Sequence, residues 1–206
     1  MSKATQTDAM GSIQRGIKRT LDFVMSALGL ILLSPLFIII SVLMKFQGNG
    51  PIFFRQIRIG YKGKPFVILK FRTISKKTEK NTPQLIAKTS CKSSTPFEKF
   101  LREHHLDELP QLWNVLVGDM SLVGPRPERK YFIDKIMEHT DLYTVIYNMR
   151  PGLTSEATLY NGYTDTMEKM LKRLQMDINY FERRSLWLDF KIIIKTFVNI
   201  ISGNKF

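Results

Sequence analysis

An apolar stretch runs from Phe23 to Met44 without a charged residue. It holds about 22 residues, which at roughly 1.5 Å per residue is long enough to cross the hydrocarbon core of a bilayer. Its apolar part is longer than that of a secretory signal peptide, and no small-residue cleavage site follows it. The pattern therefore predicts a membrane segment that the mature protein retains, and we place it within residues 13–47.

Ser34 and Pro35 stand at the middle of this stretch. Proline has no amide hydrogen, so it frees a backbone carbonyl in the preceding turn that lipid cannot satisfy. A break there leaves two legs of about a dozen residues, each roughly 17 Å long, which can enter one leaflet and return. A kinked spanning helix is the alternative.

Basic residues flank the apolar stretch on both sides, whereas a single span normally carries its basic flank on one side. We therefore expect a re-entrant helix-break-helix with both ends on the cytoplasmic face. The flanking residues are Arg15, Lys18 and Arg19 before it, and Lys45, Arg55, Arg58, Lys62 and Lys64 after it.

The next pattern is that of two strands. Residues 52–57 and 66–71 are rich in aromatic and β-branched residues, and a glycine-containing turn at 60–65 separates them, which predicts a hairpin. Lys70 and Arg72 share one face of the second strand, since side chains alternate along a strand. We expect both to point toward an anionic pocket. The alternative is that they serve solubility at a sheet edge.

Two adjacent acids, Asp107 and Glu108, follow a predicted helix. Residues 95–98 read Thr-Pro-Phe-Glu, which is typical of a capping box with proline at the first helical position. Pro110 interrupts the pattern because its ring clashes with the carbonyl of Leu106. If a second helix begins there, the acids lie near its amino end, which favours their ionised form.

This arrangement suits phosphoryl transfer. An ionised aspartate can act as a nucleophile and form a covalent acyl phosphate. A neighbouring carboxylate can hold Mg²⁺, which takes one or two protein carboxylates and fills its other positions with water and substrate phosphate. A zinc site is not supported, because no cluster of His or Cys accompanies the acids. The alternative is that both acids lie on a solvated helix face.

Arg126 supplies the complementary charge. It lies in the turn Gly-Pro-Arg-Pro at residues 124–127, and the two prolines restrict the backbone on either side of it. A stiffly held guanidinium matches the oxygens of a phosphate better than a flexible lysine does. An ordinary surface turn is the alternative, and the position of Arg126 after the acid pair favours phosphate binding.

In this order, these motifs resemble those of the bacterial sugar transferases, also called monotopic phosphoglycosyl transferases, which start glycan assembly on a membrane-bound polyprenol phosphate. The resemblance covers roughly residues 13–200. Its pieces are Ser34-Pro35, Lys70-Phe71-Arg72-Thr73, Leu106-Asp107-Glu108-Leu109-Pro110-Gln111, Gly118-Asp119-Met120-Ser121, Gly124-Pro125-Arg126-Pro127, Arg150-Pro151-Gly152 and Asp177 with Tyr180 and Asp189.

The resemblance implies a two-step reaction in which Asp107 attacks the β-phosphate of a UDP-sugar, releases UMP and then passes the phosphosugar to polyprenol phosphate. Glu108, together with Asp107, would bind Mg²⁺. Arg102 and Arg126 match phosphate-contacting positions. The remaining expected substrate-binding residues are Lys70, Arg72, Arg150, Asp177 and Asp189, although the last two could equally be helix-surface acids.

The composition agrees with an enzyme at a membrane surface. The formal net charge of +13 and the pI near 9.9 favour binding to an anionic leaflet and to anionic substrates. No nucleic-acid-binding signature focuses these charges, so nucleic acid is not an expected partner. Cys91 is the single cysteine, which excludes an intramolecular disulfide and fits a reducing cytosolic face.

The chain therefore predicts an α/β fold that is mainly helical, with the re-entrant segment, a small β-hairpin and interfacial amphipathic helices. Residues 1–12 are expected to be a flexible tail and 48–206 a catalytic domain on the cytoplasmic face of the bacterial inner membrane. Residues 186–201 read as an interfacial helix with Trp187 near the headgroups, or else as a helix packed on the core. A non-catalytic membrane adaptor is the alternative function, and a homodimer remains open.

Overall fold

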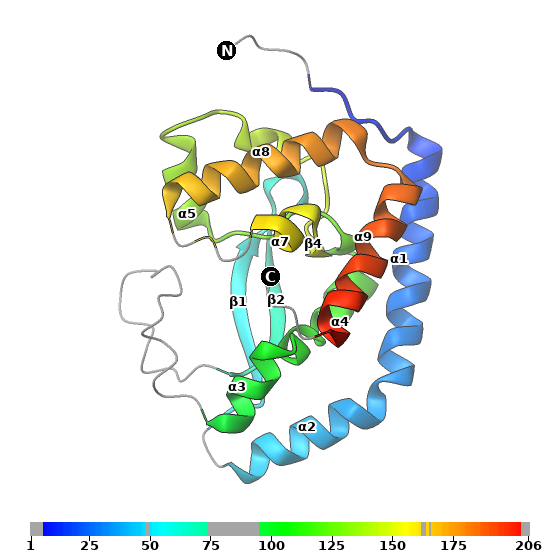
Figure 1. Ribbon diagram of the computed structural model, residues 1–206, viewed down its shortest axis with the longest axis vertical. Helices are drawn as coiled ribbons and strands as arrows, with labels where there is room; N and C mark the ends of the chain where they lie inside the picture. Colours follow the sequence, from blue (N-terminus) through cyan, green and yellow to red (C-terminus); the bar gives the residue numbers. More distant parts are fainter. Residues whose placement is uncertain (1–5, 48–49, 74–94, 162–163, 165, 203–206) are drawn as a thin grey trace.

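The computed structural model describes residues 6–47, 50–73, 95–161, 164 and 166–202, so Cys91 and its polar segment lie outside the described residues. The described part is mainly helical with small β elements, as expected (Figure 1). The helices are α1 (Ser12–Leu32), α2 (Ser34–Phe46), α3 (Pro96–Glu103), α4 (Gln111–Val117), α5 (Lys130–Met137), α6 (Tyr143–Ile146), α7 (Glu156–Asn161), α8 (Met167–Arg183) and α9 (Leu186–Ile201).

The apolar N-terminal stretch is broken where the serine–proline pair predicts it. Helices α1 and α2 meet at an angle of 58° with Leu33 between them. Pro35 fits the first turn of α2, where a missing amide hydrogen costs little, and Ser34 Oγ donates to the Ile31 carbonyl at 2.7 Å. Among the described residues, α1 and α2 have the length and apolar composition to cross a bilayer as a bent pair, and neither does so alone.

The expected hairpin is confirmed. Strands β1 (Phe53–Ile59) and β2 (Pro65–Phe71) pair in antiparallel register through the short turn η1 (Tyr61–Gly63). The side-chain amide of Asn114, on α4, covers the outer edge of β2 by donating to the Val67 carbonyl and accepting from the Leu69 amide at 2.8 and 3.0 Å. These two hydrogen bonds hold α4 against the strand that carries Lys70.

A second, parallel pair of strands was not anticipated from the sequence. It joins β3 (Ser121–Val123) to β4 (Gly152–Thr154). The Gly124 amide donates to the Thr154 carbonyl at 3.0 Å, and the Gly152 amide donates to the Pro125 carbonyl at 2.9 Å. A side chain on either glycine would overlap the backbone of the other segment. The Gly-Pro-Arg-Pro and Arg-Pro-Gly motifs are therefore one packed unit.

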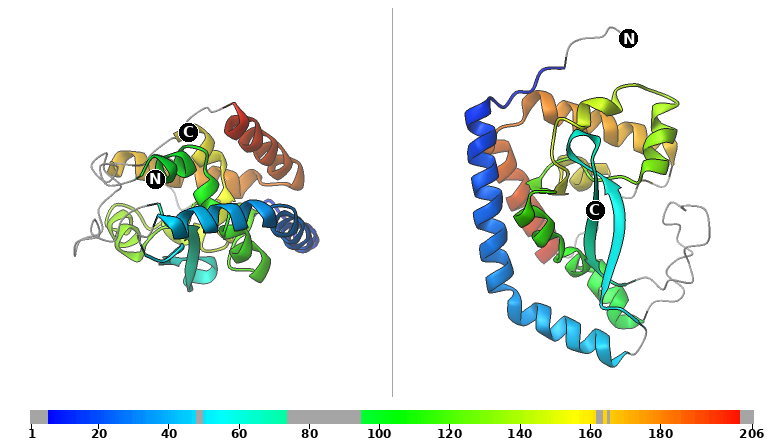
Figure 2. Two further views of the ribbon diagram at one scale, coloured as in Figure 1. Left: turned by 90° about the horizontal axis from the view of Figure 1, so that it is seen from below. Right: turned by 180° about the vertical axis from the view of Figure 1, so that it is seen from behind.

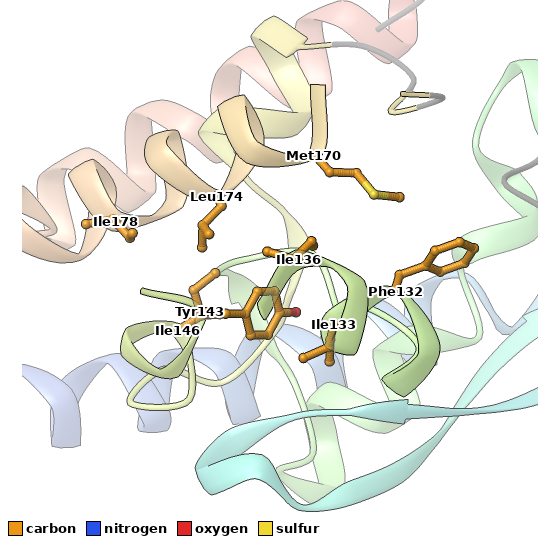
Figure 3. Packing of buried hydrophobic residues seen from close by; sticks show 8 residues of the cluster. All are labelled: Phe132, Ile133, Ile136, Tyr143, Ile146, Met170, Leu174 and Ile178. Carbon is orange, nitrogen blue, oxygen red and sulfur yellow. The ribbon is translucent and has the colours of Figure 1, made fainter. Parts of the chain in front are cut away.

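The largest buried cluster lies beneath this unit, between α5, α6 and α8 (Figure 3). Their apolar side chains point toward one another across the gap between α8 and the two shorter helices. Ile59 at the end of β1 packs against this cluster, and Arg126 lines a small cavity beside it, so the core borders both the hairpin and the loop that carries Arg126. It consists of Phe132, Ile133, Ile136, Tyr143, Ile146, Met170, Leu174 and Ile178.

Helix α1 packs along the domain beside α4 (Figure 2), and polar contacts hold its first half. Asp8, just before it, accepts two bonds from Arg184 at 2.6 and 2.7 Å. Lys18 pairs with Asp189 at 2.5 Å, and Asp22 accepts from the Leu122 amide at 3.0 Å. The segment 1–12, expected to be a tail, thus includes a residue that the fold holds by an ion pair.

Helix α9 has two faces. Ile192 is buried in a cluster with Val123, Tyr180 and Phe181, so this face packs on the core. The other face exposes Trp187, Phe190, Ile194, Phe197 and Val198, each at 46% or more of its surface. Helix α9 therefore packs on the core, as the alternative predicted, and exposes an apolar face as well; its place at a membrane interface stays a prediction.

Candidate active site

The acid pair lies in a sharp turn directly after α3. The predicted capping box is confirmed, because Thr95 Oγ1 accepts from the Glu98 amide and Glu98 accepts from the Thr95 amide. His105 then adopts a left-handed conformation, with φ 54° and ψ 18°. The chain next forms a single 3-10 turn, η4 (Leu106–Glu108), before Pro110 and α4. The acids lie near the start of α4, as expected, but in a turn of their own.

Glu108 is the centre of a charged cluster. Its Oε1 accepts from Lys70 Nζ at 2.5 Å and from Arg126 Nη2 at 3.1 Å. Only 14% of the Glu108 side chain is exposed, against 18% for Lys70 and 35% for Arg126. Strand β2 and the proline-flanked loop thus each bring a cation to one carboxylate oxygen of turn η4. The fold therefore joins Lys70, Glu108 and Arg126, which were predicted from three separate motifs.

Burial and charge give the two acids different pKa values. Burial, followed by the charge of Glu108, raises the pKa of Asp107 to about 6, although Lys70 and Arg126 oppose this shift. Burial alone would raise the pKa of Glu108, but Lys70 and Arg126 together hold it well below its usual range. Desolvation outweighs any effect of the helix end on Asp107, yet a pKa of about 6 leaves its carboxylate mostly ionised at neutral pH, so the expected ionised form stands.

This difference assigns different tasks to the two acids. Glu108 stays ionised at any ordinary pH and therefore holds the two cations in place. Asp107 is mostly ionised at neutral pH, and its raised pKa makes it a better nucleophile than an ordinary surface aspartate. The arrangement can therefore supply one reactive carboxylate beside two cationic groups that bind anions.

The site offers few protein ligands for Mg²⁺. Within the described ranges, no group of three or more His, Cys, Asp or Glu residues is placed to hold a metal ion. Two adjacent carboxylates are nonetheless enough for a cation that keeps several waters and binds substrate phosphate. Lys70 and Arg126 both contact Oε1 of Glu108, so they do not occupy its Oε2.

Arg72 and Arg102, two of the expected phosphate-binding residues, have partners on or just after α3. Arg72 is buried and pairs with Glu98 of α3, at 3.9 Å between Nη2 and Oε1. Arg102 lies in the last turn of α3, and its carbonyl accepts the His105 amide at 3.2 Å. The role of each in binding phosphate stays a prediction.

Arg150 has contacts that serve the fold. Its Nε donates to the Gly118 carbonyl at 2.9 Å, and its guanidinium lies 5.1 Å from the centre of the Tyr61 ring. Gly118 ends α4 with φ 98°, so this bond ties the segment before β4 to the C-terminal end of α4. A substrate-binding role for Arg150 stays a prediction beside this structural one.

The two C-terminal acids occupy different places. Asp189 accepts from Tyr180 and Lys18, each at 2.5 Å, and so joins α9 to α8 and α1. Asp177 is buried on α8, and burial raises its pKa to about 8 despite the charge of Arg173. It lines a small cavity together with Arg126, so it lies behind the proline-flanked loop.

Three charged residues near Arg126 were missed by sequence reasoning. Glu128 accepts from Arg173 Nη1 at 3.0 Å and pairs with Arg58 Nη1 at 3.5 Å. The position of Glu128 directly after the proline-flanked loop was the one available signal. Arg58 was noted only as a basic residue after the apolar stretch, and Arg173 gave no signal, because both are distant from Glu128 in the sequence and the fold alone brings them together.

Comparison with known proteins gives the family. The model of the bacterial sugar transferase family matches residues 13–203. A UDP-glucose:undecaprenyl-phosphate glucose-1-phosphate transferase of Klebsiella pneumoniae is 40% identical over 190 residues, covering 91% of this chain and 40% of the relative. A protein of the same name from Caulobacter vibrioides is also 40% identical, covering 90% of this chain and 70% of the relative.

A third relative is named for a different sugar. The UDP-N-acetylgalactosamine-undecaprenyl-phosphate N-acetylgalactosaminephosphotransferase of Aeromonas hydrophila is 36% identical, covering 91% of this chain and 44% of the relative. The chain thus spans about two fifths of the length of the Klebsiella and Aeromonas proteins. The similarity identifies the family and leaves the choice of sugar open.

Proposed function

Because this chain belongs to the bacterial sugar transferase family, we propose that it moves a sugar-1-phosphate from a UDP-sugar to undecaprenyl phosphate. The observation that carries the proposal is the convergence of Lys70 and Arg126 on Glu108, beside the buried Asp107. The names of the matched relatives supply the substrate classes: a UDP-linked sugar and undecaprenyl phosphate.

In the first step, a carboxylate oxygen of Asp107 attacks the β-phosphorus of the UDP-sugar. A bond forms between that oxygen and phosphorus, and the bond from phosphorus to the bridging oxygen breaks. UMP leaves with the electron pair. In the second step, a phosphate oxygen of undecaprenyl phosphate attacks the same phosphorus, which releases the Asp107 carboxylate and forms a lipid diphosphate-linked sugar.

The cations make both steps feasible. Donor, acceptor and nucleophile are all anionic, so the approach of Asp107 to phosphorus requires positive charge nearby. Arg126 is the more exposed of the two cations and is suited to contact the phosphates, while Lys70 holds Glu108. Mg²⁺, bound by Glu108 with Asp107, would neutralise charge on the diphosphate.

We further propose that the chain lies on the cytoplasmic face of the inner membrane, with residues 13–47 re-entrant and 48–206 forming the catalytic domain. Support comes from the bend between α1 and α2 and from the basic net charge. Apolar side chains exposed on α1, α2 and α9 also favour contact with lipid. They include Ile17, Leu21, Leu28, Ile31, Ile38, Val42, Trp187 and Phe197.

The test is release of UMP by the purified full chain in lipid nanodiscs with Mg²⁺, undecaprenyl phosphate and a panel of UDP-sugars that includes UDP-glucose and UDP-N-acetylgalactosamine. We expect release with at least one donor, abolished by Asp107→Asn. The matched control is Asp134→Asn, which removes an exposed carboxylate from α5.

Intact mass measured with donor alone should increase by one sugar phosphate, and digestion should place this mass on the peptide that contains Asp107. Turnover that continues in Asp107→Asn would reject the nucleophile. No release with any donor would instead favour the non-catalytic adaptor.

A further inference from the structure

We propose that Glu128 is a positioning residue which, with Arg58 and Arg173, holds the loop 125–127 so that Arg126 reaches the acid pair. This inference rests on the proposed function, because it assigns to Arg126 the task of binding phosphate. Glu128 lies two residues after Arg126, at the end of the loop and before α5.

The carboxylate of Glu128 joins elements that are distant in the sequence. One oxygen accepts from Arg173 of α8 at 3.0 Å, and the other lies 3.5 Å from Arg58 of β1. The three side chains are 10% to 20% exposed, so the cluster is largely shielded from water. A shielded, charged hydrogen bond is stronger than a surface one and fixes geometry.

The backbone of the loop is held by the same residues. Arg58 Nη1 donates to the Pro127 carbonyl at 3.0 Å, and the Ile59 amide donates to the Glu128 carbonyl at 3.0 Å. Arg58 thus contacts both the main chain before Glu128 and the side chain of Glu128. The far end of the loop is fixed by the bond between the Gly152 amide and the Pro125 carbonyl. Arg126 lies between these two anchors.

Charge balance explains why an acid is needed at this position. Burial lowers the pKa of Arg58 and of Arg173, and the positive charge of Arg126 lowers both further. The negative charge of Glu128 is the main effect that raises them. Replacing Glu128 by a neutral residue would leave three guanidinium groups close together in a shielded site. They would repel one another, and the side-chain contacts that fix Glu128 to β1 and α8 would weaken, so the loop would no longer hold Arg126 in one position beside Glu108.

The test is a double-mutant cycle between Glu128 and Arg126 in the full chain in nanodiscs. Calorimetric titration with inorganic pyrophosphate measures anion binding without turnover, and UMP release measures the proposed reaction. We expect Glu128→Gln and Arg126→Gln each to weaken pyrophosphate binding about tenfold, with the double variant no weaker than Arg126→Gln alone. Asp134→Asn should leave binding unchanged.

Glu128→Asp covers the case in which Glu128→Gln fails to fold. It keeps the charge but withdraws the carboxylate from Arg58 and Arg173, so it should give an intermediate loss that disappears in the Arg126→Gln background. Two losses that multiply to about a hundredfold would overturn the inference and mean a merely structural role. Unchanged affinity in both Glu128 variants, or wild-type protein that does not bind pyrophosphate, would also overturn it.

The two proposals fail separately. If no UDP-sugar gives UMP but the pyrophosphate cycle is non-additive, the proposed reaction is wrong and the positioning role of Glu128 stands. If UMP is released and the cycle is additive, the reaction stands and the positioning role is wrong.

Discussion

Lys70 donates a 2.5 Å hydrogen bond to Glu108, the immediate neighbour of the candidate nucleophile. The lysine comes from strand β2 and the glutamate from turn η4, which are 38 residues apart in the chain. The same oxygen of Glu108 also accepts from Arg126, so one carboxylate positions both cations beside the acid pair. Lys70 therefore influences the nucleophile through charge as well as through position.

Removing the charge of Lys70 should change the pH dependence of the reaction. Asp107 has a pKa raised to about 6, so kcat/KM for the donor should rise with pH through about 6 as its carboxylate ionises. Lys70 lowers this pKa, so Lys70→Gln should shift the rise to higher pH and reduce kcat/KM about tenfold at neutral pH.

The control is Lys64→Gln, which removes an exposed lysine from the same hairpin. UMP release measured from pH 5 to 9 tests the prediction. A rise at the same pH in wild type and Lys70→Gln would contradict it.

Asp177 should make the protein less stable as pH rises. Its pKa is about 8 in the folded state against an ordinary value of 3.8, so between these values the folded protein keeps a proton that the unfolded chain releases. Stability from this group is fully present below pH 3.8, declines by up to about 1.4 kcal/mol per pH unit, and is lost above about pH 8.

Asp177→Asn removes this dependence. Its free energy of unfolding relative to wild type should therefore rise between pH 5 and 8.5, as measured by denaturant unfolding. The charges that act on Asp177 are those of Arg173, Glu128 and Glu156, and the substitution leaves them in place. A constant difference between the two proteins across this range would show that Asp177 is not protonated in the fold.

Gly152→Ala should destabilise the joined loops. The added methyl group would overlap the backbone of Gly124, which cannot yield without separating β3 from β4. We expect a loss of about 3 kcal/mol in the free energy of unfolding, together with loss of UMP release. Gly16→Ala is the matched control, because nothing lies within 4 Å of its added methyl group. Equal stability of the two variants would disprove the close approach of the loops.

His105 tests the turn that precedes the acids. Its φ of 54° is strained for any residue with a β-carbon, and glycine adopts it without cost. His105→Gly and His105→Ala both remove the imidazole, so their comparison isolates the backbone. The glycine variant should be the more stable by about 1 kcal/mol in thermal or denaturant unfolding. If alanine is the more stable, the left-handed turn is absent.

Local rules explain what the sequence could predict. The capping box at Thr95, the break at Pro110 and the hairpin before Phe71 each depend on residues that lie close together in the chain, and each is present in the structure. The bend at Ser34 follows from the same kind of rule. These elements could therefore be predicted because the residues that determine each of them are close together in the sequence.

Long-range contacts explain what could not be predicted. The parallel pairing of β3 with β4 depends on strands separated by α5 and α6, and neither strand exceeds three residues. The raised pKa of Asp107 depends on how deeply the finished fold buries it. The partners of Glu128 likewise lie on distant elements, Arg58 on β1 and Arg173 on α8, and only the folded structure places them next to it.

The ion pairs of Asp8 and Asp189, and the hydrogen bond that Asp22 accepts from the Leu122 amide, hold helix α1 at its start and partway along its length. Arg19 of α1 also donates to the Val115 and Leu116 carbonyls of α4, the helix that follows the acid pair, so we expect α1 and the acid pair to move together. The height of Asp107 above any surface on which α1 rests is thus fixed by the fold. An acceptor held in that surface must bring its reacting phosphate to this height.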